Sequence, residues 1–292
     1  MLKLESISKT YADGTQALIN VSMEIGTGMV GLLGPNGAGK SSLMRTIATL
    51  QSADSGTLLL DGENVSETPN LLRRQLGYLP QHFGVYPHIS CRGLLEHLAI
   101  MKGLNDRRVR EQQIEQLLSL TNLTHMAHRQ VRYFSGGMLQ RFGVAQALLG
   151  DPKVLILDEP TSGLDPAERL RLHAVLHEVA KTRMLLLSTH IVEDIEHLCG
   201  KTYILLSGEI VANGVTSSLF ESLEGKIWQG TMDASDVSPE ATILSQNLHY
   251  GVPVSRVYAE VQPNSEMKLA KPCLQDRYFL HLNGVTLGGD LC

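Results

Sequence analysis

A glycine-rich segment near the N-terminus constrains the fold of this chain more than any other feature of its sequence. The segment reads Gly34-Pro35-Asn36-Gly37-Ala38-Gly39-Lys40-Ser41-Ser42 and fits the pattern GxxxxGK[ST]. Phosphate groups are bound by backbone N–H groups that point inward, and glycines let a chain wrap a phosphate that closely. The apolar stretch Met29 to Leu33 precedes the segment, and a helix-forming stretch, Lys40 to Leu50, follows it. This order of strand, loop and helix predicts a phosphate-binding unit of a parallel α/β sheet.

Two side chains of the segment suit a nucleoside triphosphate with its metal ion. The Lys40 ammonium can reach the β- and γ-phosphates, and the Ser41 hydroxyl can ligate Mg²⁺. The alternative is a glycine-rich turn that matches the pattern by accident, and the flanking strand and helix disfavour it.

A pair of acids follows a second apolar strand. Val154 to Leu157 ends in Asp158 and Glu159. An acid at the carboxyl end of a strand beside the phosphate loop can hold Mg²⁺, and the adjacent Glu159 can then polarise an attacking water. Acid pairs also follow many strands that carry no chemistry, but the pairing with the loop favours catalysis.

Both motifs together leave kinases, GTPases and other NTPases open, and the lack of an NKxD motif disfavours a GTPase.

Composition and charge narrow the class of protein further. The 292 residues are 43% hydrophobic and 19% charged, as in ordinary globular proteins, and the net charge of -5 gives no electrostatic reason to expect nucleic acid. The N-terminus lacks the pattern of a signal peptide, and no apolar run approaches the roughly 18 to 20 residues that a membrane-spanning helix needs. We therefore expect a soluble protein whose membrane role, if any, is exerted through a partner.

The cysteines indicate a reducing compartment. Cys91, Cys199, Cys273 and Cys292 are scattered without a CxxC pair, which argues against a disulfide framework and against a zinc site. A Cys273–Cys292 pair is conceivable, but we expect free thiols.

The pattern along the chain predicts two domains. Alternating residues before the glycine loop predict a sheet, and residues 82–150 read as a helical subdomain inserted into the core. Strands at 184–188 and 201–206 complete the core, and the pattern weakens after residue 215 into a small α+β appendage. We therefore assign 1–214 to one domain and 215–292 to an accessory domain.

Some histidines and arginines invite a functional interpretation but favour a simpler one. His173 and His177 lie four residues apart, but without the glutamate of HExxH they are interpreted as a surface pair, as are His125 and His128. The cluster of Arg107, Arg108 and Arg110 is interpreted as a solvated helix face.

The segment Phe134-Ser135-Gly136-Gly137-Met138-Leu139-Gln140-Arg141 decides between the NTPase classes, because it resembles the LSGGQxQR signature of the ABC (ATP-binding cassette) ATPases. Other features of that family fall in the expected order over residues 1–214: an aromatic residue before the loop, a Q-loop, a D-loop and an H-loop, at Tyr11, Gln81, Ser162 to Asp165, and Ser188 to His190. Phe134 replaces leucine and Met138 replaces glutamine, while Ser135 and Gly137, the phosphate-contacting members, are retained.

The resemblance implies a P-loop NTPase fold with a RecA-like parallel-sheet core, an antiparallel β subdomain and the inserted helices. It also implies two cassettes that pair head to tail around two MgATP, a homodimer or a heterodimer with a related chain. Roles follow for single residues: ATP binding by Tyr11, the loop residues Gly34 to Ser42, and Ser135, Gly136, Gly137 and Asp165 of the opposite cassette; Mg²⁺ binding by Ser41, Gln81 and Asp158; catalysis by Glu159, His190, Gln81 and Lys40.

The same resemblance implies an integral-membrane permease as partner, which places the chain at the cytoplasmic face of the cell membrane. We expect residues 82–88 to receive a short helix of that permease. The short tail, the segment 188–196 and the ending 276–282 resemble the branch that exports drugs, antimicrobial peptides or ions, so we expect export. An importer, a non-transport ABC ATPase and a purely regulatory binding module are the alternatives.

Overall fold

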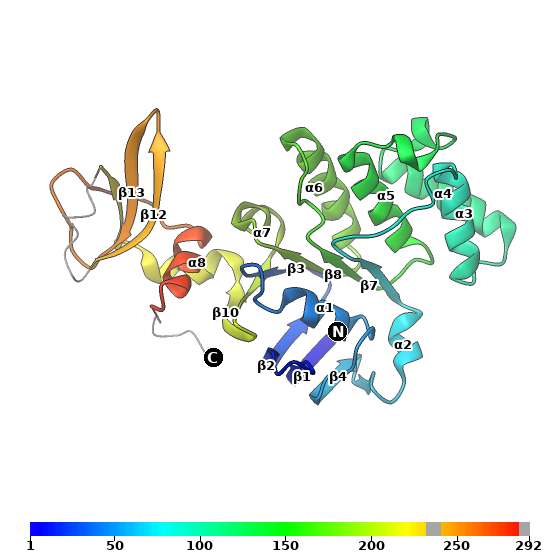
Figure 1. The fold of residues 1–292 in the computed structure, drawn as a ribbon, viewed down its shortest axis with the longest axis horizontal. Coiled ribbons are helices and arrows are strands. Elements are labelled where there is room, and N and C mark those ends of the chain that lie inside the picture. Colours follow the sequence, from blue (N-terminus) through cyan, green and yellow to red (C-terminus); the bar gives the residue numbers. More distant parts are fainter. Residues whose placement is uncertain (232–240, 286–292) are drawn as a thin grey trace.

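The computed structural model describes residues 1–231 and 241–285, which form three sheets and a set of helices (Figure 1). The helices α3, α4 and α5 lie at one end of the molecule, and the sheet that contains β12 and β13 lies at the other. Among the described residues, no helix combines the length and the apolar character that crossing a membrane requires.

The first sheet is antiparallel, and two of its strands precede the glycine loop in sequence while the other two follow α1. Its strands lie in the order β2-β1-β4-β5, with bounds β1 Leu2–Thr10, β2 Gln16–Ile25, β4 Ser55–Leu60 and β5 Glu63–Asn64. The predicted alternation is confirmed, because Leu2 and Leu4 of β1 are buried and pair with Ile25 and Met23 of β2. A hairpin turn at Asp61 and Gly62 joins β4 to β5, with both residues at positive φ.

The second sheet is the core of the molecule. Its order is β10-β9-β3-β8-β7-β6, where β6 to β9 and β3 are parallel and β10 alone is antiparallel. The bounds are β3 Gly28–Leu33, β6 Leu76–Leu79, β7 Val154–Asp158, β8 Met184–Thr189, β9 Lys201–Leu206 and β10 Glu209–Val215. Each apolar run predicted as a buried strand is therefore a strand of this sheet.

Both faces of the core sheet are covered, which explains why its strands read as continuous apolar runs. Val154 and Ile156 of β7 pack in one hydrophobic core with α1 (Lys40–Ile47) and the antiparallel sheet. Leu155 and Leu157 of the same strand pack in a second core under α5 (Gly136–Leu148), α6 (Pro166–Ala180) and α7 (Val192–Leu198).

The inserted helical region is present as predicted between β6 and β7. After α2 (Pro69–Arg73) and β6 it contains α3 (Cys91–Met101), α4 (Arg107–Leu120), two short 3-10 turns (Thr124–Met126 and Val131–Tyr133) and α5. The predicted solvated face of α4 holds for Arg107 and Arg108 but is wrong for Arg110. Arg110 is buried because its guanidinium donates to the carbonyls of Leu104 and Asn105, which keeps the charge solvated by protein.

The interpretation of His173 and His177 as a surface pair is also half wrong. His177 is exposed, but the His173 side chain is 12% exposed and its Nε2 lies 2.9 Å from Asp194 Oδ1. The residues His125 and His128 are exposed, as expected.

The residues after β10 fold into a third sheet and a helix. A 3-10 segment (Thr216–Leu223) leads to the antiparallel sheet β12-β13-β11-β14, with bounds β11 Ile227–Gly230, β12 Thr242–His249, β13 Val252–Tyr258 and β14 Lys268–Leu269. Helix α8 (Leu274–Leu282) packs Leu280 toward this sheet and Leu274 and Tyr278 into the core of α5 to α7. Helix α8 and the 3-10 segment, which packs Leu219 and Phe220 on the same core, therefore join the residues after β10 to the rest of the described chain.

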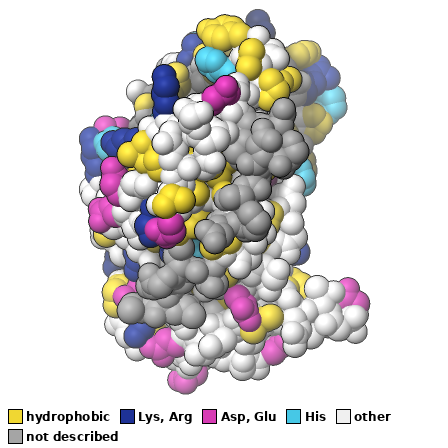
Figure 2. Space-filling view, turned by 90° about the vertical axis from the view of Figure 1, so that its left-hand side faces the viewer, with side chains coloured by type: hydrophobic (Ala, Val, Ile, Leu, Met, Phe, Trp, Pro, Cys, Tyr) yellow, Lys and Arg dark blue, Asp and Glu magenta, His cyan; other side chains and the backbone are white. Residues whose placement is uncertain are grey.

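The outer face of the accessory region carries both signs of charge interspersed with uncharged surface (Figure 2). Leu248, Tyr250 and Val252 at the tip of the β12–β13 hairpin are exposed. Cys91, Cys199 and Cys273 are free thiols, and the conceivable Cys273–Cys292 pair lies outside the described residues.

Candidate active site

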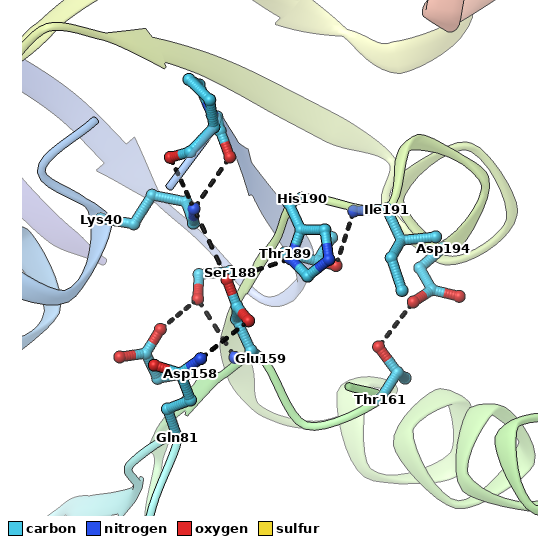
Figure 3. A network of polar contacts seen from close by, with 12 residues as sticks. Lys40, Gln81, Asp158, Glu159, Thr161, Ser188, Thr189, His190, Ile191 and Asp194 are labelled. Atoms are coloured by element: carbon cyan, nitrogen blue, oxygen red, sulfur yellow. Dashed lines mark hydrogen bonds and ion pairs between the residues drawn. The ribbon is translucent and has the colours of Figure 1, made fainter. Parts of the chain in front are cut away.

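Four loops meet at the carboxyl ends of neighbouring core strands. The glycine loop follows β3, Gln81 follows β6, Glu159 follows β7 and His190 follows β8. Because parallel strands end at the same edge of a sheet, residues far apart in sequence are brought together there. Figure 3 shows Lys40, Gln81, Glu159 and His190 in one network of polar contacts.

The glycine loop needs its last glycine for two reasons. Gly39 has a φ of 104°, in the left-handed region, and it is the N-cap of α1. A Cβ atom at Gly39 would lie 2.3 Å from the carbonyl oxygen of Ala17. The loop can therefore pass directly onto the N-terminus of α1, where free N–H groups and the helix dipole favour an anion.

A cavity of about 570 Å³ opens over this loop. The predicted binding residues that line it are Tyr11, Asn36, Gly37, Gly39, Lys40, Ser41 and Ser42, together with Gln81 and Glu159. Gly34, Pro35 and Ala38 are not among its lining residues, and they form the turn behind it: a Cβ at Gly34 would lie 2.4 Å from the carbonyl oxygen of Leu205. Sequence reasoning missed Thr15, Gln16, Ala17 and Ser207 in the lining.

The Lys40 ammonium is buried among oxygens. Its Nζ donates to the carbonyls of Gly34 and Pro35 at 2.8 and 3.0 Å and lies 3.6 Å from Glu159 Oε1. Burial lowers the pKa of Lys40, and the nearby carboxylates of Glu159 and Asp158 oppose that shift. Because the Lys40 ammonium has exchanged water for carbonyl contacts, a nearby anion such as a phosphate stabilises its charge.

The acid pair at the end of β7 is held by the neighbouring strand. Ser188 Oγ of β8 donates to Asp158 Oδ1 at 2.5 Å, and the Glu159 N–H donates to the Ser188 carbonyl and hydroxyl oxygens at 3.1 and 3.2 Å. Glu159 has a φ of 49°, which a side-chain-bearing residue rarely adopts and which costs about 1 to 3 kcal/mol in general. Backbone strain of this kind concentrates at functional sites, where the surrounding contacts hold it.

The Glu159 carboxylate is the centre of the site. Gln81 Nε2 donates to Oε2 at 3.0 Å, and His190 Nδ1 lies 3.2 Å from Oε1, which also faces Lys40. The side chains of Asp158 and Glu159 are nearly buried, while that of His190 is 42% exposed. The other three predicted catalytic residues therefore all face the carboxylate of the fourth, Glu159.

Three side chains in or beside this network carry oxygens suitable for Mg²⁺: Ser41 and Gln81 line the cavity, and Asp158 accepts from Ser188. The Ser41 hydroxyl, the Asp158 carboxylate and the Gln81 amide are hard donors of the kind that Mg²⁺ takes, together with substrate phosphates and water. No cluster of three or more His, Cys, Asp and Glu that could hold a metal occurs in the described part of the chain. These residues fit an ion that is held mainly by its nucleotide.

Tyr11 lies at the rim of the cavity. Its hydroxyl is 2.9 Å from Ser42 Oγ and donates to Gln51 Oε1 at 3.1 Å, and 36% of the residue is exposed. The hydroxyl contacts fix the ring beside the glycine loop, and the exposed ring is available for stacking.

The signature residues lie outside this cavity. Ser135 is the N-cap of α5 and accepts from the Met138 N–H at 3.2 Å, so the helix begins at Gly136. Gly137 is buried against Glu168, where a Cβ would lie 2.6 Å from the Glu168 side chain. No described residue that lines the cavity comes from 134–141. Within one chain, the two predicted halves of the ATP site are therefore separate.

The two departures from the signature are accommodated by packing. Phe134 stacks edge to face on Phe142 at 6.4 Å, and Met138 packs against the same core. Asp165 has a structural role in this chain, because it caps α6 by accepting from the Glu168 N–H at 2.8 Å.

Comparisons with known proteins identify the family to which this chain is similar. A family model described as "ABC transporter" matches residues 18–162. The chain is 35% identical over 284 residues to an uncharacterised ABC transporter ATP-binding protein, YxlF, of Bacillus subtilis, covering 88% of this chain and 94% of the relative. It is 36% identical over 227 residues to the Nod factor export ATP-binding protein I of Cupriavidus metallidurans (76% and 73% covered). It is 32% identical over 250 residues to the molybdate/tungstate import ATP-binding protein WtpC of Methanocaldococcus jannaschii (84% and 82% covered).

A solved structure resembles the chain as well. It is a dimeric post-hydrolysis state of an ATP-binding cassette bound to ADP and Pi, with a TM-score of 0.67 and 25% sequence identity. The likeness covers 74% of this chain and 98% of that one.

Proposed function

Since this chain belongs to the ABC transporter family, as an ATPase and the ATP-binding subunit of a transporter, we propose that two cassettes close head to tail around two MgATP and thereby drive a separate permease, for export. The observation that carries the proposal is the convergence of Lys40, Gln81 and His190 on the Glu159 carboxylate.

One side of each ATP site is formed by the glycine loop. The N–H groups of Gly37 to Ser42 and the Lys40 ammonium bind the phosphates, and the Tyr11 ring stacks on the adenine. Ser41, Gln81 and Asp158 would hold Mg²⁺, which would neutralise phosphate charge. The lining of the cavity supports this assignment, because it joins Tyr11 to the loop.

Hydrolysis is assigned to residues around Glu159. Its carboxylate orients an attacking water and takes up a proton from it, and Gln81 helps to hold that water. His190 contacts the γ-phosphate and keeps the Glu159 carboxylate in place. The buried position of Glu159 supports this role, because a fixed carboxylate needs little reorganisation in the transition state.

The other side of each ATP site comes from the second cassette. Ser135, Gly136 and Gly137 at the N-terminus of its α5 bind the γ-phosphate, and Asp165 lies between the two sites. Two findings support this arrangement: the signature residues do not line the cavity of their own chain, and the similar solved structure is dimeric.

Replacement of Glu159 tests the catalytic assignment. Glu159→Gln keeps the size of the side chain but removes the base, so we expect ATP turnover to fall by about a hundredfold or more while ATP binding persists. Lys40→Ala is the matched control, because it should lose ATP binding as well. Undiminished turnover in Glu159→Gln would overturn the assignment.

The permease is proposed to dock at residues 82–88, next to Gln81. The chain would then lie on the cytoplasmic face of the membrane. In this segment Phe83 and Val85 pack onto the core, whereas Tyr86 is 62% exposed and meets His97 edge to face. Tyr86→Glu should abolish co-purification of the permease with the folded chain. The control is Tyr250→Glu, at the 96% exposed hairpin tip. Intact complex formation in Tyr86→Glu would place the docking surface elsewhere.

Export is proposed over import, although ATP-binding proteins of both directions are similar to this chain. The relative named for Nod factor export supports export. In inside-out membrane vesicles with the wild-type chain, MgATP should drive accumulation of a labelled amphiphilic peptide or drug. Vesicles with the Glu159→Gln variant should not accumulate it. ATP-driven release of preloaded solute would identify an importer. No nucleic-acid partner is proposed.

A further inference from the structure

A buried carboxylate outside the cavity connects the loop after β7 to helix α7. Asp194 of α7 is 1% exposed, and its Oδ2 accepts a hydrogen bond of 2.6 Å from Thr161 Oγ1 (Figure 3). Thr161 is fully buried and follows Glu159 by two residues, while Asp194 follows His190 by four. The contact therefore joins the loop after β7 to helix α7, which begins two residues after His190.

Helix α6 supports the same carboxylate from the other side. His173 Nε2 lies 2.9 Å from Asp194 Oδ1, and Arg169 Nε lies 4.0 Å from it. Burial alone would raise the pKa of Asp194, but the contacts with His173 and Thr161 outweigh it and the pKa is lowered. Asp194 therefore stays charged, which makes it a strong acceptor for the Thr161 hydroxyl.

Asp194 is itself firmly placed, because α7 sits directly on the central strand β3. A Cβ at Gly31 of β3 would lie 2.5 Å from Ile195 Cδ1, so the helix approaches the strand as closely as a glycine permits. On the other side of the bond, the Thr161 carbonyl accepts from the Leu164 N–H and the Glu159 carbonyl accepts from the Ser162 N–H, which makes residues 159–164 one compact turn. A displacement of Thr161 would thus carry Glu159 with it.

We propose that the Thr161–Asp194 hydrogen bond is a positioning contact for ATP hydrolysis, which fixes the Glu159 carboxylate against His190. The inference rests on the roles proposed above for Glu159 and His190. Neither Thr161 nor Asp194 lines the ATP cavity, so both act through the loops and not on the nucleotide.

The test compares Thr161→Val and Thr161→Ser in the full chain purified with its membrane subunit. Valine keeps the shape and removes the donor, and serine keeps the donor. For Thr161→Val we expect kcat to fall roughly tenfold to a hundredfold, because small misplacements of a catalytic group have effects of that size. KM for ATP should stay within about twofold, since uniform binding is unchanged. Thr161→Ser should recover most of kcat.

A matched control separates positioning from stability. Thr202 is also fully buried, and its hydroxyl pairs with Thr216 Oγ1 at 2.8 Å at the opposite end of the core sheet. Thr202→Val should lower the melting temperature as Thr161→Val does but leave kcat per folded molecule unchanged. If Thr161→Val fails to fold, Asp194→Asn, which keeps an acceptor of the same shape without the charge, should lower kcat in the same direction.

Either of two results would overturn the inference: wild-type kcat in folded Thr161→Val, or a loss in Thr161→Val that Thr161→Ser does not recover. Failure of the proposed function is distinguishable, because in that case Glu159→Gln itself would retain turnover.

Discussion

Arg141 and Glu168 form a buried ion pair of 3.1 Å that joins the signature helix α5 to helix α6, whose N-cap is Asp165. The two side chains are 4% and 14% exposed, and Arg141 also donates to the carbonyl of Thr121 at 3.1 Å. The segment with Ser135 and the segment with Asp165 are thus held as one unit.

Removal of Arg141 leaves the Glu168 carboxylate in a largely dry site. We expect Arg141→Ala to lower the free energy of unfolding by about 3 kcal/mol, the lower end of the range for breaking a buried pair, because Arg171 still contacts the Glu168 carboxylate. Arg171 contacts the same carboxylate at 2.7 Å from a side chain that is 57% exposed, and Arg171→Ala should change stability by less than about 1 kcal/mol. Urea unfolding of both variants checks the contrast, and equal effects would contradict it.

Helix α8 is anchored to the accessory sheet by a second ion pair. Arg256 of β13 donates to both carboxylate oxygens of Asp276 at 2.7 and 2.6 Å, and Asp276 is 1% exposed. Since the Arg256 side chain is 21% exposed, we expect the lower end of the buried-pair range, about 3 kcal/mol, for Arg256→Ala. Hydrogen exchange should rise in the α8 peptide. Lys226→Ala, which removes the exposed pair with Glu260, should leave α8 protected, and equal exchange in both variants would contradict the anchoring role.

The accessory region should lose stability in mild acid through His281. Burial, and then the nearby Arg277, lowers the pKa of His281 to about 4 from 6.5. Between these values the unfolded chain binds a proton that the folded chain does not, so stability falls as the pH drops from about 7 to about 4, by at most about 3 kcal/mol. His281→Gln should flatten the dependence of unfolding free energy on pH over that interval. An unchanged slope would show that His281 does not titrate this way.

Much of the core could be predicted because its signals are local. Apolar runs such as Val154 to Leu157 fill both faces of a parallel sheet, and the spacing of Gly34, Gly39 and Lys40 fits only a tight loop before a helix. The convergence of Gln81, Glu159 and His190 followed from their positions at strand ends, once the family resemblance had identified them.

The contacts that were predicted wrongly or not predicted at all depend on tertiary packing. Nothing next to His173 in the sequence shows that α7 brings Asp194 to it. Likewise, nothing next to Arg110 shows that its side chain turns back to the carbonyls that precede its own helix. The Arg141–Glu168 and Thr161–Asp194 contacts likewise join separate elements. Such pairs carry no spacing rule, since their partners are set by how the helices pack on the sheet.

The association state of Glu159→Gln tests the central claim most directly, because this variant should hold ATP without consuming it. Sedimentation velocity should show a shift from monomer to dimer on addition of MgATP. The double variant Glu159→Gln with Ser135→Arg should still bind ATP but stay monomeric, since the arginine obstructs the γ-phosphate site of the opposite cassette. A monomer at saturating MgATP in the first variant, or a dimer in the second, would contradict an ATP clamped between Lys40 of one chain and Ser135 of the other.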